Sequence, residues 1–508
     1  MNVDAAPDTQ WSRLSRFIAD AMGLHFPRER WPDLQRGLAG AAREWGFPDV
    51  ESCMDRLLAA PPTKEQLQVL AGHLTIGETY FFREKKTFEV LANDVLPALI
   101  HSRRGREQRL RIWSAACCTG EEAYSLAIMI HRLLPDLADW RVTILATDIN
   151  AHFLRKAVAG AYGEWSFRDA PEDYRERYFT RGGDGRHVVI PAIRSMVTFA
   201  HLNLVEDVYP SLATDTNAMD LIFCRNVLMY FTPSQTGRVV GKLHHSLLGG
   251  GWLAVSPSEA SQALFPQFAT LNAPGVIIYR KDDANVRVVT SPPGPPVGAR
   301  GFFPAASEPT WAAPEEDILP RPEVLQPPPR RVEETPVREE VAPAPETLAE
   351  ALYAQGRYAE TAELLLASLA GRAPGSRTFS LLARAFANQG RLAEALAWCD
   401  RWIADDKLDP AGHYLRGVIL LEHGDYLQAR ASLQRAVYVH PDFVLAHFAL
   451  GNLARGRGLP GEAAKHFDNA LRLLAGHRQD DLLPESDNLT AGRLTETIAT
   501  LSSLKTSR

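Results

Sequence analysis

Apolar residues recur at helical spacing through residues 8 to 75. The clearest run comprises Trp11, Leu14, Phe17, Ile18 and Met22. Because these positions fall three or four residues apart, they predict a helix with one buried face, and Gly23 can close it. Thr63 followed by Gln66 forms a capping-box pattern and predicts the start of a second helix. We therefore expect an N-terminal helical domain over residues 1–75.

The pattern changes to short apolar runs that alternate with helical periodicity over residues 76–282. The runs that predict strands are Leu110–Ala115, Arg141–Thr147, Met219–Cys224 and Gly251–Ser256. Strands alternating with helices, such as the one expected over Glu121–Leu134, imply a parallel sheet covered on both faces. Phe179–Pro191 differs, since a glycine-rich turn separates two short apolar runs and predicts a small antiparallel hairpin insert. The fold class is therefore α/β.

A proline-rich segment follows, over residues 283–345. Of the 35 prolines in the chain, 15 lie between Pro292 and Pro345. Few large apolar residues accompany them, so this segment cannot bury enough surface to offset the entropy of ordering, and we expect a disordered linker. Because it separates two regions with independent hydrophobic patterns, each region is expected to fold alone.

Residues 346–475 contain a repeat with a period of 34 residues. Glycines mark the period at Gly356, Gly390, Gly424 and Gly458, and the residue five positions later is Thr361 in the first repeat and alanine in the other three. This resembles the tetratricopeptide repeat, a helix-turn-helix unit of that length, with the glycine ending the first helix. The resemblance implies an all-α solenoid that binds an unknown protein or peptide. Residues 476–508 are left as a C-terminal tail.

Composition narrows the function classes. The chain has 508 residues, 45% of them hydrophobic and 23% charged, and its net charge is −6, which disfavours a nucleic-acid partner. The five cysteines include no C-x-x-C pair, so we expect neither a disulfide framework nor a metal site. No signal peptide and no apolar run of about 18 residues is evident, which predicts a cytoplasmic protein without membrane insertion.

The loop after the first predicted strand suggests a ligand site. Residues 115–120 are small, so a ligand can approach the backbone, but no G-x-G-x-x-G is present. Glu121 and Glu122 would repel a pyrophosphate and would suit a cationic ligand such as S-adenosylmethionine. Equally, two glutamates could merely favour the positive end of the helix that they begin.

Three further segments carry candidate chemistry. Asp148 ends the second strand, where an acid can hold a ribose diol or can cap the next helix. Arg225 and Asn226 follow a buried strand and precede Tyr230, and the arginine fits an anionic acceptor better than the Asn-Pro-Pro-aromatic signature of amine and adenine methyltransferases would. Arg83 follows paired aromatic residues and could also belong to a packed interdomain helix.

Five motifs in order make a resemblance specific. They are ETYFFRE at 78–84, WSAACCTGEEAYSLA at 113–127, ATD at 146–148, FAHLNL at 199–204 and CRNVLMYF at 224–231. Over residues 10–280 the chain resembles the chemotaxis-receptor methyltransferases, the CheR family. The resemblance implies a helical N-terminal domain, an S-adenosylmethionine-dependent Rossmann-like domain with a small β insert, and methylation of glutamate side chains on chemoreceptor signalling helices.

The same resemblance implies roles for individual residues. Those that it places around the cofactor are Thr79, Arg83, Glu122 (with Glu121 as a near alternative), Asp148, Asn203, Leu204, Arg225 and Asn226. Glu122 would hold the methionine amino group and Asp148 the ribose, while Asn203 and Leu204 would meet the adenine. Arg83 and Tyr230 would lie nearest the transferred methyl group and are the expected catalytic residues.

Two departures from the family accompany these matches. Gly77 stands where many members have asparagine, and the loop reads ACCTG where Gly-Cys-Ser-Thr-Gly is common. A second hypothesis is a non-catalytic cofactor-binding scaffold that acts through its repeats, which the otherwise intact polar positions disfavour. A third, methylation of a small molecule or a nucleic acid, is disfavoured by the missing Asn-Pro-Pro signature and the acidic net charge.

Overall fold

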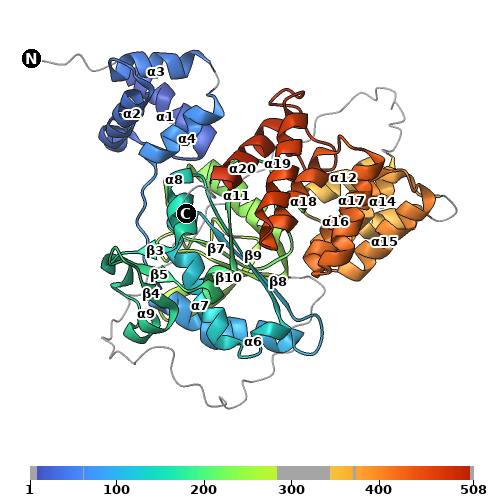
Figure 1. Cartoon of the computed structure of the whole chain (residues 1–508). Coiled ribbons are helices and arrows are strands. Elements are labelled where there is room, and N and C mark those ends of the chain that lie inside the picture. Colours follow the sequence, from blue (N-terminus) through green and yellow to red (C-terminus); the bar gives the residue numbers. More distant parts are fainter. Residues whose placement is uncertain (1–7, 61, 283–343, 370–372, 504–508) are drawn as a thin grey trace, which may run out of the picture.

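The computed structural model describes residues 8–60, 62–282, 344–369 and 373–503. The predicted linker lies almost entirely outside these residues. In the described part of the chain, a seven-stranded sheet stands at the centre, with helices on both faces and a helical array to one side (Figure 1). The predicted fold class, an α/β domain followed by helical repeats, is confirmed.

Four helices form the N-terminal part: α1 (Asp8–Met22), α2 (Trp31–Trp45), α3 (Val50–Ala59) and α4 (Lys64–Leu74). Local sequence explains their ends. Gly23, with φ of 80°, terminates α1 as expected, and Thr63 and Gln66 form the predicted capping box before α4. The four helices share a core of their own. A link through α5 (Lys85–Val90), a π-helical turn (Leu91–Val95) and α6 (Leu96–Arg103) leads into the sheet.

The strand order of the large sheet is β6-β2-β1-β7-β8-β10-β9. Their bounds are β1 (Arg109–Ala115), β2 (Arg141–Asp148), β6 (Val197–His201), β7 (Met219–Cys224), β8 (Leu247–Ala254), β9 (Phe268–Ala273) and β10 (Val276–Lys281). The first five are parallel, and β10 pairs antiparallel with both β8 and β9. The chain order reverses between β1 and β7, and ligands of open α/β sheets bind at such a reversal.

A second, three-stranded sheet carries the insert. It consists of β3 (Ala161–Tyr162), β4 (Phe179–Arg181) and β5 (His187–Val189), all antiparallel. The hairpin predicted over 179–191 supplies two of these strands. Along the chain, α8 (Ala151–Ala159) precedes this sheet, α9 (Glu172–Tyr178) lies between β3 and β4, and α10 (Pro191–Arg194) follows β5.

Side chains of the large sheet alternate between two hydrophobic layers. Ile112 and Leu221 pack toward α7 (Glu121–Leu133), whereas Trp113 and Ile222 pack toward α11 (Pro233–Ser246) and the helical repeats. This alternation is the ordinary consequence of the strand pleat. Residues 202–218, which connect β6 to β7, form no helix. The repeats therefore cover a part of the sheet that a crossover helix would otherwise cover.

The repeats form antiparallel helix pairs. Their helices are α12 (Pro345–Ala354), α13 (Tyr358–Ser368), α14 (Ser376–Asn388), α15 (Leu392–Asp405), α16 (Pro410–His423), α17 (Tyr426–Val439), α18 (Val444–Gly456) and α19 (Pro460–Leu474). All four period-marking glycines have positive φ, between 69° and 84°. Thr361 and the three equivalent alanines are fully buried, which matches the 34-residue pattern.

The two halves are not separate in space. One hydrophobic core runs without a break from Trp113 and Ile222 of the sheet to the repeats. Gly356 lies against His245 of α11, and Gly424 lies against Arg141 of β2. Arg109 of β1 forms a buried ion pair with Glu422 of α16 at 2.5 Å. The two regions that were expected to fold alone thus share one core in the structure.

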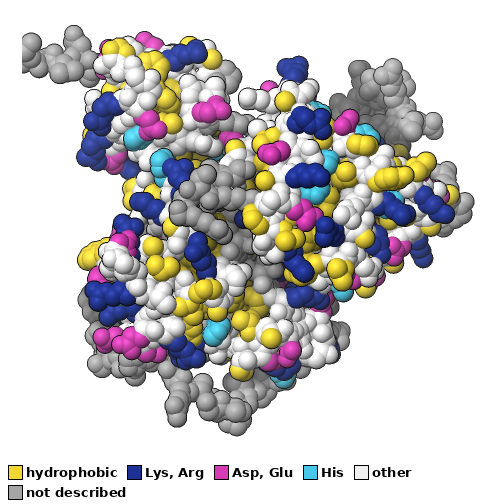
Figure 2. All heavy atoms as spheres, in the orientation of Figure 1, with side chains coloured by type: hydrophobic (Ala, Val, Ile, Leu, Met, Phe, Trp, Pro, Cys, Tyr) yellow, Lys and Arg dark blue, Asp and Glu magenta, His cyan; other side chains and the backbone are white. Residues whose placement is uncertain are grey.

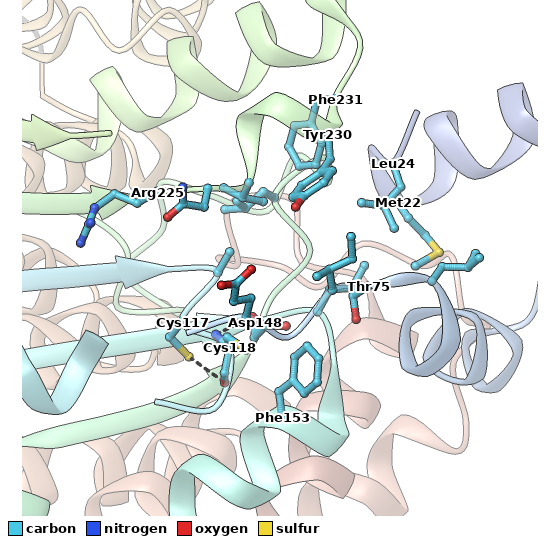
Figure 3. A pocket seen from close by; sticks show the side chains of 18 of the residues that line it. Met22, Leu24, Thr75, Cys117, Cys118, Asp148, Phe153, Arg225, Tyr230 and Phe231 are labelled. Carbon is cyan, nitrogen blue, oxygen red and sulfur yellow. Dashed lines mark hydrogen bonds between the residues drawn. The ribbon is translucent and has the colours of Figure 1, made fainter. Parts of the chain in front are cut away.

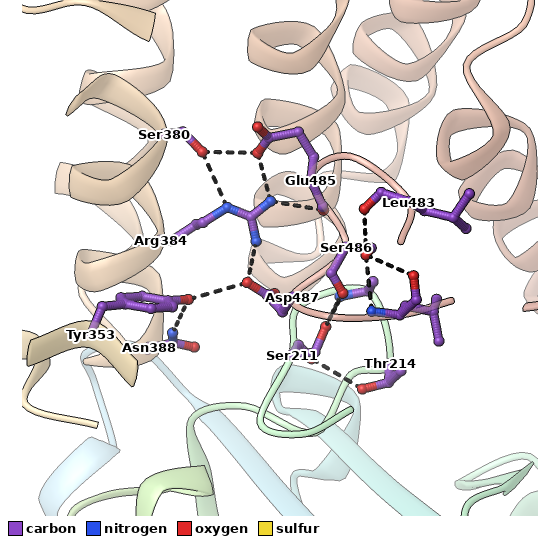
Figure 4. A network of polar contacts seen from close by, with 12 residues as sticks. Ser211, Thr214, Tyr353, Ser380, Arg384, Asn388, Leu483, Glu485, Ser486 and Asp487 are labelled. Carbon is purple, nitrogen blue, oxygen red and sulfur yellow. Dashed lines mark hydrogen bonds and ion pairs between the residues drawn. The ribbon is translucent and has the colours of Figure 1, made fainter. Parts of the chain in front are cut away.

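The predicted tail is folded against the repeats and ends in α20 (Ala491–Ser503). Figure 4 shows a loop of this segment lying between the repeats and the loop that precedes β7. Arg384 of α14 donates hydrogen bonds to Glu485 (2.7 Å) and Asp487 (2.6 Å), and the Ser211 hydroxyl donates to the Ser486 carbonyl (3.4 Å). The tail therefore joins the repeats to the α/β part.

Candidate functional site

A cavity opens at the carboxyl ends of β1, β2, β6 and β7. It lies at the point where the strand order reverses, and residues of the N-terminal helices close one side of it (Figure 3). All nine residues that the sequence singled out line this cavity: Thr79, Arg83, Glu122, Asp148, Asn203, Leu204, Arg225, Asn226 and Tyr230. Every residue that lines this cavity precedes β8 in the sequence.

The loop between β1 and α7 is held in an unusual backbone conformation. Ala116 and Cys118 have φ of 63° and 51°, and Gly120 has 93°. Left-handed conformations are costly for residues other than glycine, and they persist where the surrounding structure enforces them. Here the Cys117 N–H donates to the Thr147 carbonyl at 2.9 Å, and this bond ties the loop to the end of β2.

Asp148 lies at the centre of the cavity, with its carboxylate directed between Tyr230 and Phe153 (Figure 3). One carboxylate oxygen accepts from the Cys118 N–H and the other from the Asn150 N–H, both at 2.8 Å. Each oxygen keeps a second lone pair for a ligand. Burial raises the pKa of Asp148 to about 6, although these backbone hydrogen bonds oppose the shift.

Asp148 does not cap the helix that follows it, because another residue does so. Asn150 caps α8, because its side-chain oxygen accepts from the N–H groups of His152 and Phe153. Its amide nitrogen also donates to the Thr75 hydroxyl at 2.8 Å, which links α8 to the end of α4. Asp148 is thus left facing the cavity.

Glu122 and its neighbour Glu121 have different surroundings. The Glu121 carboxylate accepts hydrogen bonds from Thr119 (2.6 Å) and Ser166 (3.0 Å) and does not line the cavity. Glu122 lines it and accepts hydrogen bonds from the Ser114 hydroxyl at 2.7 Å and from the Arg225 guanidinium at 3.4 Å. Burial raises the pKa of Glu122, and Arg225 opposes this shift. The geometry favours Glu122 as the residue that meets a cationic group.

Arg225 is enclosed by protein partners. Its guanidinium donates to the Arg83 carbonyl at 2.7 Å and pairs with Glu84 at 2.8 Å, while its side chain is 1% exposed. Figure 3 shows the guanidinium turned away from Asp148 and Tyr230. Arg225 therefore positions Glu122 and the backbone at Arg83, and it is poorly placed to grip an incoming carboxylate.

The Arg83 guanidinium is held by fewer protein partners than that of Arg225. Its guanidinium donates to the Glu78 carbonyl and lies 5.7 Å from the centre of the Tyr80 ring. No carboxylate in the described part of the chain forms an ion pair with it. Phe82 and Glu84, on either side of it, both have positive φ, so the backbone that presents Arg83 is constrained.

The N-terminal helices complete the cavity wall. The Asn203 side chain donates to the Ala21 carbonyl at 2.9 Å, and the His25 N–H donates to the Tyr230 carbonyl at 2.7 Å. Arg30 lies over the Tyr230 ring, 5.5 Å from its centre. The Asn203 amide nitrogen is therefore used in joining the two parts, a contact that sequence reasoning did not foresee.

Sequence reasoning also missed Glu259, which holds the loop after β7. Its buried carboxylate accepts from the N–H groups of Asn226 (2.8 Å), Val227 (2.7 Å) and Met229 (3.2 Å), and from the N–H (3.0 Å) and hydroxyl (2.6 Å) of Ser256. Asn226 has φ of 57°, so this anchor stabilises a strained turn. An acid just beyond the end of β8 was the signal that could have revealed it.

Gly77, the departure from the family pattern, has a packing explanation. A Cβ at this position would lie 2.6 Å from the ring of Phe153. The ring of Phe153 lines the cavity and would have to move to admit any larger residue. Ala116, the second departure, occupies a left-handed position that suits the glycine more common there.

Comparison with known proteins decides the family. The description "CheR methyltransferase, SAM binding domain" matches residues 77–276, and tetratricopeptide-repeat descriptions match residues 352–419 and 414–477. Chemotaxis protein methyltransferase 1 of Pseudomonas aeruginosa is 40% identical over 217 residues, which are 42% of this chain and 77% of that protein. The chain belongs to the CheR methyltransferase family.

Further CheR relatives match over a longer stretch of the chain. Chemotaxis protein methyltransferase Cher2 of Pseudomonas putida is 33% identical over 270 residues, 52% of this chain and 95% of that protein. The chemotaxis protein methyltransferase of Borreliella burgdorferi is 30% identical over 261 residues, 51% of this chain and 90% of that protein. These relatives account for the α/β part, and S-adenosylmethionine is its methyl donor. The repeats are an addition with a protein-interaction character.

The cavity residues fit S-adenosylmethionine. Asp148 is buried, Glu122 is partly buried, and both carboxylates have unused acceptor capacity; the ligand offers a ribose diol and a cationic amino group as their partners. Leu24, Phe153 and Phe231 supply apolar walls for the rest of the molecule. In the described part of the chain, no helix is both long and apolar enough to cross a membrane.

Proposed function

We propose that this CheR protein transfers a methyl group from S-adenosylmethionine to glutamate side chains of methyl-accepting chemoreceptors and forms γ-methyl esters. The observation that supports this most directly is the single cavity in which Arg83 and Tyr230 stand beside the carboxylates Glu122 and Asp148. The names of its relatives, chemotaxis protein methyltransferases, are consistent with receptors as substrates. The repeats would recruit a protein partner.

Each cavity residue has a distinct part in the proposal. Glu122 holds the methionine amino group, Asp148 accepts from the ribose hydroxyls, and the backbone at Leu204 borders the adenine. Arg225 keeps Glu122 in place through their ion pair. Bound S-adenosylmethionine supplies an electrophilic methyl group on a sulfonium.

The acceptor side of the reaction demands little from the protein. A glutamate side chain with a pKa of about 4.3 is ionised at neutral pH, so no general base is required. Arg83 orients the incoming carboxylate, since it is the cavity arginine without a carboxylate partner in the described part of the chain. The Tyr230 hydroxyl donates to the second carboxylate oxygen. Alignment and exclusion of water supply the rate enhancement.

The test is transfer of a labelled methyl group to a receptor signalling fragment. We expect alkali-labile label that is released as methanol, with mass spectrometry locating it on glutamate. Arg83→Ala should abolish transfer but retain cofactor binding, whereas Arg435→Ala, an exposed residue of α17, should match the wild type. Label on another residue type would contradict the glutamate assignment. Absence of any transfer by a protein that binds the cofactor would favour the scaffold hypothesis.

A further inference from the structure

A second cavity lies between the large sheet and the repeats, away from the proposed active site. Its floor is the face of β1, β2 and β6 that the missing crossover helix leaves open, and it includes Thr143 and Thr198. Its roof is formed by α16, α18 and α20, with Tyr414 and Phe448 among the lining residues. The space encloses about 560 Å³, enough for a small organic molecule.

Arginines dominate the polar lining of this cavity. They are Arg109, Arg111, Arg141, Arg455, Arg457 and Arg493, whereas the carboxylates that line it are Asp215 and Glu422. Because burying a cation without a partner is costly, the burial and the partners of each arginine decide what this excess means. The surroundings of each arginine show where the imbalance lies.

Half of these arginines are neutralised by the protein itself. Arg109 and Arg111 share Glu422, at 2.5 and 3.9 Å, and Arg111 also pairs with Asp215 at 2.7 Å. Arg493 pairs with two glutamates, at 3.1 and 2.7 Å. The pairs with Glu422 join the repeats to the sheet, and the pair between Arg493 and Glu206 joins α20 to the α/β part.

The other three arginines that line the cavity are Arg141, Arg455 and Arg457. None of them has a carboxylate within 4 Å in the described part of the chain. Arg141 has a buried Nη1 without a hydrogen-bond partner, and Arg455 has a buried Nε in the same condition. Burial also lowers the pKa of Arg455. Arg457 is exposed and lies over the Tyr426 ring, 5.9 Å from its centre. An anion bound in the cavity would accept hydrogen bonds from the unpaired nitrogens of Arg141 and Arg455.

We propose that this cavity binds a small phosphorylated organic molecule, with Arg141 and Arg455 as its phosphate-binding groups. A guanidinium presents forked donors that match phosphate oxygens. The apolar walls, including Tyr414, Val418 and Phe448, suit the organic part of the ligand. The site draws residues from both halves of the molecule, so neither half has it alone.

Calorimetry on the full-length chain tests the proposal. The probes are inorganic phosphate, adenosine and guanosine monophosphates, and a hexose phosphate, which together separate free phosphate, nucleotide and sugar phosphate as sources. We expect at least one probe to bind, and Arg141→Gln and Arg455→Gln each to weaken it at least tenfold. The control Arg435→Gln, an exposed arginine outside the cavity, should stay within twofold.

A folding defect must be distinguished from loss of the site. Each variant is therefore also titrated with S-adenosylhomocysteine, which should bind to the first cavity unchanged. Arg455→Lys keeps the positive charge but lacks the paired N–H donors of the guanidinium, so it should lose less affinity than Arg455→Gln. The proposal is overturned if no probe binds, or if binding persists in both glutamine variants.

Discussion

Asp148 illustrates how one buried side chain can couple pH to ligand binding. Its pKa of about 6 means that the free protein carries this carboxyl partly protonated in mildly acidic solution. The ionised form accepts hydrogen bonds from a ribose diol more strongly than the neutral form. Binding of the cofactor should therefore favour the ionised form.

We expect the affinity for S-adenosylmethionine to fall as the pH falls through about 6, by about tenfold for each further pH unit. Asp148→Asn should bind weakly and show a much flatter profile over the same range. Calorimetry between pH 5 and 8 checks both. An identical slope in the variant would assign the titration to another group, of which Glu122 is the foremost, since its pKa is also raised.

The raised pKa of Asp148 also affects folding stability, which should increase as the pH falls, whereas the affinity for the cofactor should decrease. A carboxyl whose pKa is higher in the folded state stabilises the fold most below its unfolded value of 3.8, and this contribution is lost as the pH rises through about 6. A shift of this size corresponds to about 3 kcal/mol. We expect cofactor-free Asp148→Asn to unfold at higher denaturant concentration than the wild type at pH 7.5, and to lose that advantage near pH 4. Equal midpoints at both pH values would contradict the shift.

Glu259 is a positioning residue in the proposed site. Glu259→Gln removes the charge and replaces one acceptor oxygen by a donor, which leaves several N–H groups of the strained loop unsatisfied. We expect a loss of about 2–4 kcal/mol in unfolding free energy and a marked loss of affinity for S-adenosylhomocysteine. Denaturant titration and calorimetry measure the two effects. The control Glu176→Gln, on the exposed side of α9, should change neither.

At the scale of elements, local sequence signals located most of the fold. Met219–Cys224 has the predicted bounds of β7, and the other predicted strands match to within a few residues. Asp148 and Glu122 could be proposed because small loops and acids at strand ends have a recognisable pattern. Glu259, β6 and the antiparallel pair β9 and β10 were not predicted as such, because their roles depend on partners that are distant in the sequence.

The period-marking glycines offer a test of how the repeats meet the α/β part. A Cβ at Gly356 would lie 2.4 Å from the His245 ring, whereas at Gly458 nothing lies within 4 Å. Both have positive φ, so an alanine costs about 1–2 kcal/mol of backbone strain at either site. Only Gly356→Ala adds a clash. We expect it to lower the melting temperature more than Gly458→Ala, and equal losses would mean that this contact is weak in solution.

At the scale of the whole molecule, the sequence did not predict the interface between the α/β part and the repeats. Arg109 and Glu422 are 313 positions apart, and nothing near either residue indicates a partner. The proline-rich composition of residues 283–345 suggested independent halves. The shared core instead means that truncation after residue 282 would expose apolar residues such as Ile222 to water.

Cleavage within residues 283–343 should consequently leave the halves associated. We expect a chain with an engineered protease site there to elute as one species in size-exclusion chromatography after cutting, at micromolar concentration. Glu422→Arg should separate the fragments, because it places a third cation beside Arg109 and Arg111. Glu363→Arg, on the exposed side of α13, serves as the matched control. Separation of the wild-type fragments after cleavage would show that the contacts are too weak to hold the halves together.

The loop that carries Glu485 and Asp487 has a consequence for any outside partner of the repeats. It acts as a tethered competitor, since it already satisfies Arg384 and contacts Tyr353. A tethered group acts at an effective concentration on the order of millimolar. A free peptide that used the same contacts with micromolar intrinsic affinity would therefore bind roughly a thousandfold more weakly. The repeats should bind partners that present several copies of such a segment or make additional contacts. A single short acidic segment should bind only weakly.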